Sequence, residues 1–158
     1  MVVNRQRRIR VALVPLSGFL EKIRRALRFP KDSIAVQLVS DSAMARMNLK
    51  FRKKNGPTDV LSFPVNGPSS GKGPRRSKGK RAPALAPRTN EVYVGDIAIA
   101  PETAWRNARS YSRSLDEELR ILMLHGMIHL AGYDHETDTG QMNRFERRLR
   151  RRFGLSLS

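Results

Sequence analysis

The chain of 158 residues contains no cysteine, few acidic residues and no long apolar run. The lack of cysteine excludes disulfide partners and thiolate metal sites, and it favours a reducing compartment, so we expect a cytoplasmic protein. Any metal must then be held by His, Asp or Glu. The longest apolar run, Ile121 to Leu130, contains two histidines and is too short to cross a bilayer, so we expect no membrane partner. The run at 9–14 ends at Pro15 and lacks a signal-peptide cleavage site.

The scarcity of acids leaves a large positive charge, since 14 Asp and Glu face 31 Lys and Arg for a net charge of +17. Such an excess predicts a polyanionic partner, most simply nucleic acid, although charge can also serve solubility alone. Clustering of the charge favours the polyanion. The clusters are Arg5, Arg7, Arg8 and Arg10; Arg144, Arg147, Arg148, Arg150, Arg151 and Arg152; and the segment 66–90.

Residues 66–90 differ from the rest of the chain in composition. They carry seven basic residues, among them Arg75, Arg76 and Lys80, and no acid. A segment with so little to bury cannot offset its ordering entropy, so we expect it to be disordered when free and to contact the polyanionic partner as a flexible arm. The remainder keeps a net charge of +10 after these seven are subtracted from +17. It fits a single domain over 1–158, interrupted by this basic insertion.

Periodicity and capping signals predict an α+β fold in which about four strands form a mixed sheet packed with about five helices. Ser114 and Glu117 have the spacing of a capping box at the start of a central helix, and Pro101 starts the preceding one. The expected strands are 9–14, 34–39, 60–63 and 92–100, and the expected helices are 16–28, 41–50, 101–110, 114–131 and one that begins at Asp138.

All three histidines of the chain fall within eleven residues, with the spacing H-x3-H-x5-H. His125 and His129 lie one turn apart on the same helix face, and Gly132 can leave the helix in a left-handed conformation that returns His135 toward them. Three nitrogen ligands with one open position are typical of catalytic zinc. Nickel, copper or iron would accept the same ligands, and a helical histidine can also simply belong to a core. We expect the metal at the end of the central helix and the following turn.

The same spacing occurs in zinc peptidases with the pattern H-E-x-x-H-x-x-G-x-x-H. Gly126 stands where these enzymes carry the glutamate that acts as general base, which argues against a peptidase unless another carboxylate substitutes. A carboxylate from Asp134, Glu136 or Asp138 in the fourth position would instead make the metal structural.

A second polar block precedes and begins the strand at 60–63. Each residue can be explained by local capping and turns, but Arg52 also has the forked donors that recognise phosphate. Asp96, in a later strand, is either a buried acid or a partner that orients a metal-bound imidazole. The block contains Asn48, Arg52, Thr58, Asp59 and Ser62.

Three blocks together resemble the YbeY family of bacterial endoribonucleases. His125-Gly-Met-Ile-His129-Leu-Ala-Gly-Tyr-Asp-His135 is similar to the family's H-G-x-L-H-L-x-G-Y-D-H. Asn48-Leu-Lys-Phe-Arg52 with Pro57-Thr-Asp-Val-Leu-Ser-Phe-Pro64 resembles N-x-x-Y-R…T-D-V-L-S-F-P, and Gly95-Asp-Ile resembles G-D-I. Phe51 and Ile128 are conservative departures. The basic insertion has no counterpart that we can match.

The resemblance implies one Zn²⁺ per chain on the three histidines, with Arg52 as the family's essential arginine in a positively charged cleft. It implies cleavage of single-stranded RNA, maturation of small-subunit rRNA near its 3′ end, a part in ribosome quality control, and the small ribosomal subunit as partner. A non-catalytic ribosome-associated RNA-binding factor and a zinc hydrolase of other substrates are the alternatives. The candidate residues are Arg52 and His125 for catalysis; His125, His129 and His135 for metal; Asp96, Asp134 and Asp59 for support; and Arg144, Arg148, Arg75, Arg76 and Lys80 for RNA.

Overall fold

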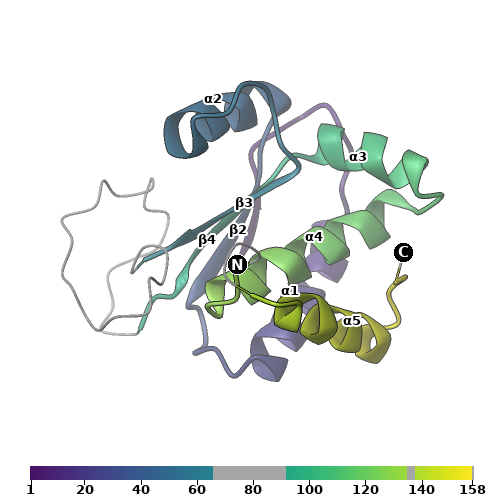
Figure 1. Ribbon diagram of the computed structural model, residues 1–158. Helices are drawn as coiled ribbons and strands as arrows, with labels where there is room; N and C mark the ends of the chain where they lie inside the picture. Colours follow the sequence, from purple (N-terminus) through teal and green to yellow (C-terminus); the bar gives the residue numbers. More distant parts are fainter. Residues whose placement is uncertain (66–91, 135–137, 158) are drawn as a thin grey trace.

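A computed structural model of the protein describes residues 1–65, 92–134 and 138–157. These residues form the expected α+β fold, with four strands and five helices (Figure 1). In chain order the elements are β1 Val2–Asn4, α1 Leu13–Ala26, β2 Ile34–Leu38, α2 Asp41–Arg52, β3 Val60–Pro64, β4 Gly95–Ile99, α3 Pro101–Ser110, α4 Leu115–Leu130 and α5 Gln141–Phe153.

The sheet is mixed and has the strand order β1-β2-β4-β3. β1, β2 and β4 run parallel, whereas β3 pairs antiparallel with β4 and forms one edge. Successive side chains of a strand point to opposite faces. In β4, Ile97 and Ile99 therefore belong to the large core on one face, while Ala98 packs with Leu61 of β3 on the other.

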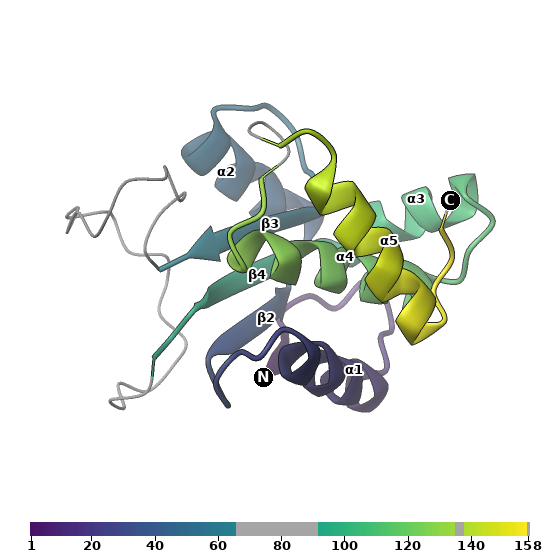
Figure 2. The same cartoon turned by 60° about the horizontal axis from the view of Figure 1, so that its bottom comes forward.

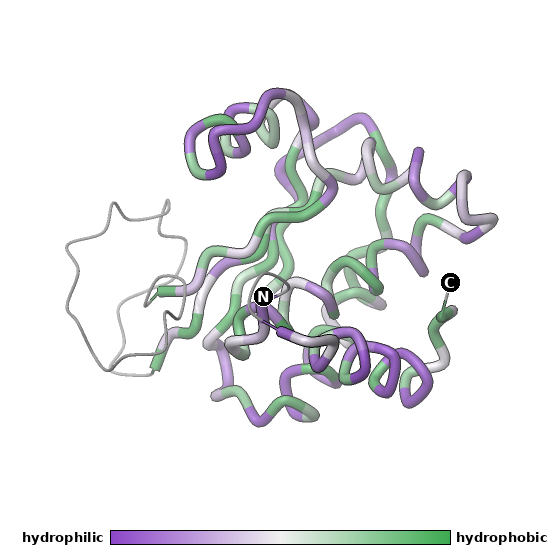
Figure 3. Tube along the Cα trace, viewed as in Figure 1, coloured by the Kyte–Doolittle hydropathy of each residue, from purple (hydrophilic) through white to green (hydrophobic). Residues whose placement is uncertain are grey.

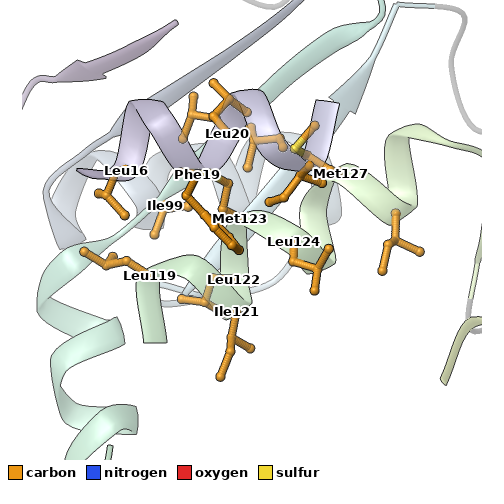
Figure 4. Packing of buried hydrophobic residues seen from close by; sticks show 14 of the residues in the cluster. Leu16, Phe19, Leu20, Ile99, Leu119, Ile121, Leu122, Met123, Leu124 and Met127 are labelled. Atoms are coloured by element: carbon orange, nitrogen blue, oxygen red, sulfur yellow. The ribbon is translucent and has the colours of Figure 1, made fainter. Parts of the chain in front are cut away.

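The large core lies between the sheet and helices α1, α4 and α5. α4 is the central helix: it contacts α1, α3, α5, β3 and β4 and is buried on nearly every side. Figure 4 shows its Leu119, Met123 and Met127 packed among Leu16 and Phe19 of α1. The hydropathy follows this arrangement, because the strands are largely apolar whereas α5 alternates between polar and apolar residues (Figure 3).

A smaller core lies on the opposite face, under α2. Met44 is fully buried there against Val39, Leu61 and Ala98. The sheet is therefore covered by α2 on one side and by α1, α4 and α5 on the other (Figures 1 and 2).

Side-chain caps set the starts of two helices. Ser40 Oγ accepts the Ala43 N–H at the start of α2, and Ser114 Oγ accepts the Glu117 N–H at 3.1 Å at the start of α4. Only this half of the expected capping box forms, because the Glu117 carboxylate accepts the N–H of Ser156 at 2.8 Å instead. The C-terminal segment is thereby held against the first turn of α4.

The strand expected at 9–14 is wrong: the first strand is Val2–Asn4, and Leu13 already begins α1. The buried side chain of Gln6 holds the intervening connection, since its amide donates to the Ile9 carbonyl and its oxygen accepts the Ile9 N–H. Pro15 is compatible with the first helical turn because that turn has no use for its missing N–H.

The last helix begins three residues later than expected, at Gln141 rather than Asp138. Asp138 still caps it, because its two carboxylate oxygens accept the N–H groups of Gly140 and Met142, each at 2.7 Å. Within the described part of the chain, every helix is too short or too polar to cross a bilayer.

Candidate metal centre and active site

His125 and His129 point their Nε2 atoms toward each other from the last two turns of α4. The two Nε2 atoms are 3.1 Å apart, and the rings meet edge to face at 78°. Two nitrogen ligands of a tetrahedral zinc, each about 2.05 Å from the ion, are about 3.3 Å apart. The observed separation is therefore close to that of two ligands sharing one metal.

The other ring nitrogen of each histidine has an acceptor. His125 Nδ1 lies 2.9 Å from Glu146 Oε2, and His129 Nδ1 lies 2.9 Å from the Tyr133 carbonyl oxygen. A carbonyl can only accept, so His129 donates from Nδ1, and an ionised Glu146 imposes the same on His125. Both Nε2 atoms then carry lone pairs directed at each other, an arrangement that a metal ion or a proton between them stabilises. The donor set fits a zinc ion.

Glu146, on α5, is buried with 5% of its surface exposed, and Arg150 holds it from the side away from His125. Arg150 Nε donates to Glu146 Oε1 at 3.0 Å, and its Nη2 donates to the same oxygen. Burial alone would raise the pKa of Glu146, but the hydrogen bonds from His125 and Arg150 and the positive charge of Arg150 outweigh it and lower the pKa below its ordinary value. The carboxylate is therefore ionised at neutral pH.

Glu146 is the residue that reading the sequence missed. A signal was present, since Glu146 is the only acid of α5 and lies in register with the buried Met142 and Leu149. A carboxylate in an apolar stripe requires a buried partner. Which partner that is depends on the packing of α5 against α4.

The turn after α4 has the expected form. Gly132 adopts a left-handed φ of +99°, and its N–H donates to the His129 carbonyl at 2.9 Å. The turn brings the Tyr133 carbonyl to His129, and the Tyr133 ring stacks on Phe145 of α5 with centroids 5.0 Å apart. α5 thus supports His125 directly and His129 through Tyr133.

Gly126 lies between the two histidines and faces the sheet. A Cβ atom there would lie 3.0 Å from an Ile97 methyl and 3.1 Å from Ser62 Oγ, and Ser62 already donates to the Gly126 carbonyl at 3.1 Å. The close approach of α4 to β3 and β4 thus leaves no room for the glutamate that peptidases carry at this position.

Most of the polar block before and within β3 makes contacts that hold the fold together, some local and some between distant elements. Asn48 donates to the Gly56 carbonyl at 2.9 Å, and Ser62 ties β3 to α4. Asp59 accepts the N–H of Val60 at 2.8 Å and the amide of Asn107 at 3.0 Å, so its carboxylate joins β3 to α3. Local capping and turns therefore account for Asn48, whereas Asp59 and Ser62 also bond to α3 and α4.

Arg52 differs from the rest of its block. It is the last residue of α2, its side chain is exposed, and it forms no hydrogen bond or ion pair with another residue of the described chain. The next residue, Lys53, takes a left-handed conformation with φ of 57° and starts the connection to β3. The guanidinium is therefore accessible to a ligand.

Asp96 faces the sheet side opposite the histidines, because it is paired with Phe63 and alternates with Ile97. Its carboxylate accepts a hydrogen bond from the Tyr93 hydroxyl at 2.5 Å. Burial raises the pKa of Asp96, which the Tyr93 hydrogen bond only partly opposes. The groups that bind the Nδ1 atoms of His125 and His129 are Glu146 and the Tyr133 carbonyl, so Asp96 orients neither of these two rings.

Several candidate residues are not brought into the centre by the described chain. His135 and the basic residues Arg75, Arg76 and Lys80 lie outside the described residues, and Asp134 adjoins the undescribed 135–137. Arg144 and Arg148 are exposed on α5. Metal ligation by His135, support by Asp134 and RNA contact by these cations stay predictions.

The chain matches a known protein family over almost its whole length. The profile of the family Endoribonuclease YbeY matches residues 4–154. The Endoribonuclease YbeY of Koribacter versatilis is 36% identical over 158 residues, covering all of this chain and 88% of the relative. That of Thermodesulfovibrio yellowstonii is 31% identical over 167 residues, covering 94% of this chain and 92% of the relative.

The fold also has a counterpart among solved structures. A solution structure of a Thermotoga maritima protein matches 98% of this chain and 92% of its own with a TM-score of 0.55, at 24% identity. That likeness shows a shared fold, whereas the profile and the curated relatives show shared ancestry. The chain belongs to the Endoribonuclease YbeY family.

Proposed function

We propose that this protein is a zinc-dependent endoribonuclease that cleaves single-stranded RNA in the cytoplasm. Its biological substrate would be small-subunit rRNA, with a role in maturation of the 16S 3′ end and in ribosome quality control. The observation that carries the chemistry is the 3.1 Å approach of two imidazole Nε2 atoms whose Nδ1 atoms are both engaged. Membership of the family and the net charge of +17 support RNA as substrate.

One zinc ion per chain would be held by His125 and His129 through Nε2, with His135 as the proposed third ligand. When bound, zinc supplies Lewis-acid chemistry, which polarises a phosphoryl oxygen and acidifies water. The protein's own contribution is to hold both rings in the tautomer that leaves Nε2 unprotonated. The ionised Glu146 also places a negative charge behind His125, which strengthens that imidazole as a donor.

Arg52 is proposed to bind the scissile phosphate and to stabilise the charge that develops on it. Its exposed guanidinium, which pairs with no carboxylate of residues 1–65, 92–134 or 138–157, supports this role. Gly126 leaves no room for a general base at its own position. The attacking group is proposed to be water or a 2′-hydroxyl of the RNA. Arg75, Arg76 and Lys80 of the basic insertion are proposed to contact the RNA backbone.

The test compares cleavage of a single-stranded RNA by wild type, His129→Ala and Arg52→Ala, with zinc content measured by mass spectrometry. We expect His129→Ala to lose zinc and cleavage together, and Arg52→Ala to keep zinc but lose most cleavage. Arg46→Ala is the matched control, since Arg46 is another exposed arginine of α2. Full cleavage by metal-free protein would overturn the proposal.

The alternatives fit the geometry less well. A purely structural metal requires a fourth protein ligand, for which Asp134, Glu136 and Asp138 are the candidates; the carboxylate of Asp138 already caps α5 by accepting the N–H groups of Gly140 and Met142. A peptide hydrolase requires a general base, which Gly126 cannot supply, so another carboxylate would have to take that role. Peptidase activity of the purified protein, or a carboxylate closing the metal site, would favour them.

A further inference from the structure

The exposed side of α5 consists almost entirely of arginine. The positions follow the helical spacing i, i+3, i+4, i+7 and i+8, so the side chains form one stripe, here called the α5 arginine face. No ion pair with an acid of the described chain neutralises it. Its members are Arg144, Arg147, Arg148, Arg151 and Arg152.

Folding by itself does not explain this stripe. Like charges three and four residues apart on a helix repel each other, and the stripe contains several such pairs. The helix dipole disfavours Arg144 near the N-terminal end of α5 and favours Arg151 and Arg152 in its last turn, so it does not offset the repulsion along the whole stripe. The only acid of α5, Glu146, is buried on the other side. The pattern therefore carries an internal cost that an external anion would remove.

The chemistry of the stripe fits phosphate. All five residues are arginine, whose forked donors bind phosphate oxygens in pairs. From Arg144 to Arg152 the stripe extends about 12 Å at 1.5 Å per residue, long enough for several phosphates of one strand. A hollow of about 240 Å³ adjoins it, lined by Asn143, Arg144, Glu146, Arg147, Arg150 and Leu157.

The stripe is also close to the centre. The inner side of α5 binds His125 through Glu146 and supports His129 through the stack of Phe145 on Tyr133. Figure 2 shows α5 lying outermost, across α4. A polyanion bound along α5 would therefore run about one helix diameter, roughly 10 Å, from the imidazoles.

We infer that the α5 arginine face docks the phosphate backbone of the RNA segment that flanks the cleaved bond. This inference rests on the proposed RNA substrate but not on the metal. It assigns α5 two tasks: its inner side holds the metal ligands in place, and its outer side holds the substrate beside them.

The test is binding of a fluorescein-labelled single-stranded RNA of twelve nucleotides in the His129→Ala background, which should not cleave it. The variant Arg144→Gln/Arg148→Gln/Arg151→Gln keeps helix propensity and removes three charges. The control Lys22→Gln/Arg25→Gln/Lys31→Gln removes three exposed cations on and just after α1, outside the basic clusters. Affinity is measured by anisotropy between 0.05 and 0.3 M salt, and folding by circular dichroism.

Each phosphate contact contributes about 0.7 to the slope of log K against log salt for a single strand, so three lost contacts should reduce the slope by about 2 and the affinity roughly 100-fold at 0.1 M. The control should change both much less. Equal losses in the two variants would mean that only net charge matters. An unchanged affinity of the α5 variant would mean that the stripe faces an acidic protein or solvent. Either result overturns the inference. Cleavage by His129→Ala would instead refute the proposed zinc chemistry and leave the docking result intact.

Discussion

The contact between Glu146 and His125 can be tested by one nearly isosteric change, Glu146→Gln. In wild type one carboxylate oxygen accepts from His125 Nδ1 and the other from Arg150. A glutamine has one oxygen and one NH₂ group. If the oxygen faces His125, the NH₂ meets the Arg150 donors; if the NH₂ faces His125, the ring must carry its proton on Nε2 and cannot bind metal. Either orientation breaks one side of the arrangement.

The expected loss follows from the two contacts. Removing a partner that orients a metal-bound histidine lowers metal affinity about 10- to 100-fold, or about 1.4 to 2.7 kcal/mol. Breaking a buried ion pair from one side costs about 3 to 5 kcal/mol, and we expect the lower end because Arg150 keeps 16% of its side chain exposed and can be rehydrated. Zinc affinity is measured by competition with a chromogenic chelator, and stability by urea unfolding of the metal-free protein.

Glu118→Gln is the matched control. Glu118 is also a buried acid paired with a buried arginine, Arg113 at 2.8 Å, but it lies near the start of α4, far along the helix from the histidines. It should lose comparable stability and leave zinc affinity unchanged. Glu146→Gln could instead lose stability and still bind zinc as tightly as wild type. Glu146 would then be a folding contact only, and the claim that it fixes the tautomer of His125 would be refuted.

Three further changes have defined outcomes. Gly126→Ala places a Cβ against Ile97 and Ser62. Although alanine has the better helix propensity, the variant should lose about 1 to 3 kcal/mol of unfolding free energy, measured in urea. A gain in stability would show that α4 can shift away from the sheet. Asp96→Asn tests the raised pKa of Asp96: the folded state favours the protonated acid, so this group's contribution to stability falls as pH rises from about 4 through the folded pKa. The variant should flatten that fall and be at least as stable as wild type at pH 7, and unfolding curves from pH 4 to 8 that paralleled those of wild type would contradict this. Deletion of 68–88 should lower RNA affinity and its salt slope with unchanged circular dichroism, and a binding curve identical to that of wild type would reduce the segment to a spacer.

Local signals in the sequence determined most of the helices and strands. The cap at Ser114, the proline at 101 and the glycine at 132 act through hydrogen bonds and backbone angles within a few residues of themselves, and all three behave as expected. The first strand was misplaced because its pairing with β2 joins residues more than thirty positions apart, as in Val2 with Val36. The apolar run at 9–14 has the local pattern of a strand, but nothing in that run specifies a second strand with which it could pair.

The candidate centre divides in the same way. The spacing of His125 and His129 by itself determined that two imidazoles share one face of a helix, and the family motif placed a metal there as a prediction. Only the tertiary structure decided which groups bind the imidazole Nδ1 atoms, because Glu146 is 21 residues from His125 and reaches it through the packing of α5 on α4. The tertiary structure likewise decided that Asp96 lies on the side of the sheet opposite His125 and His129. Periodicity specifies which face a side chain occupies, whereas protonation and orientation depend on partners brought near by the fold.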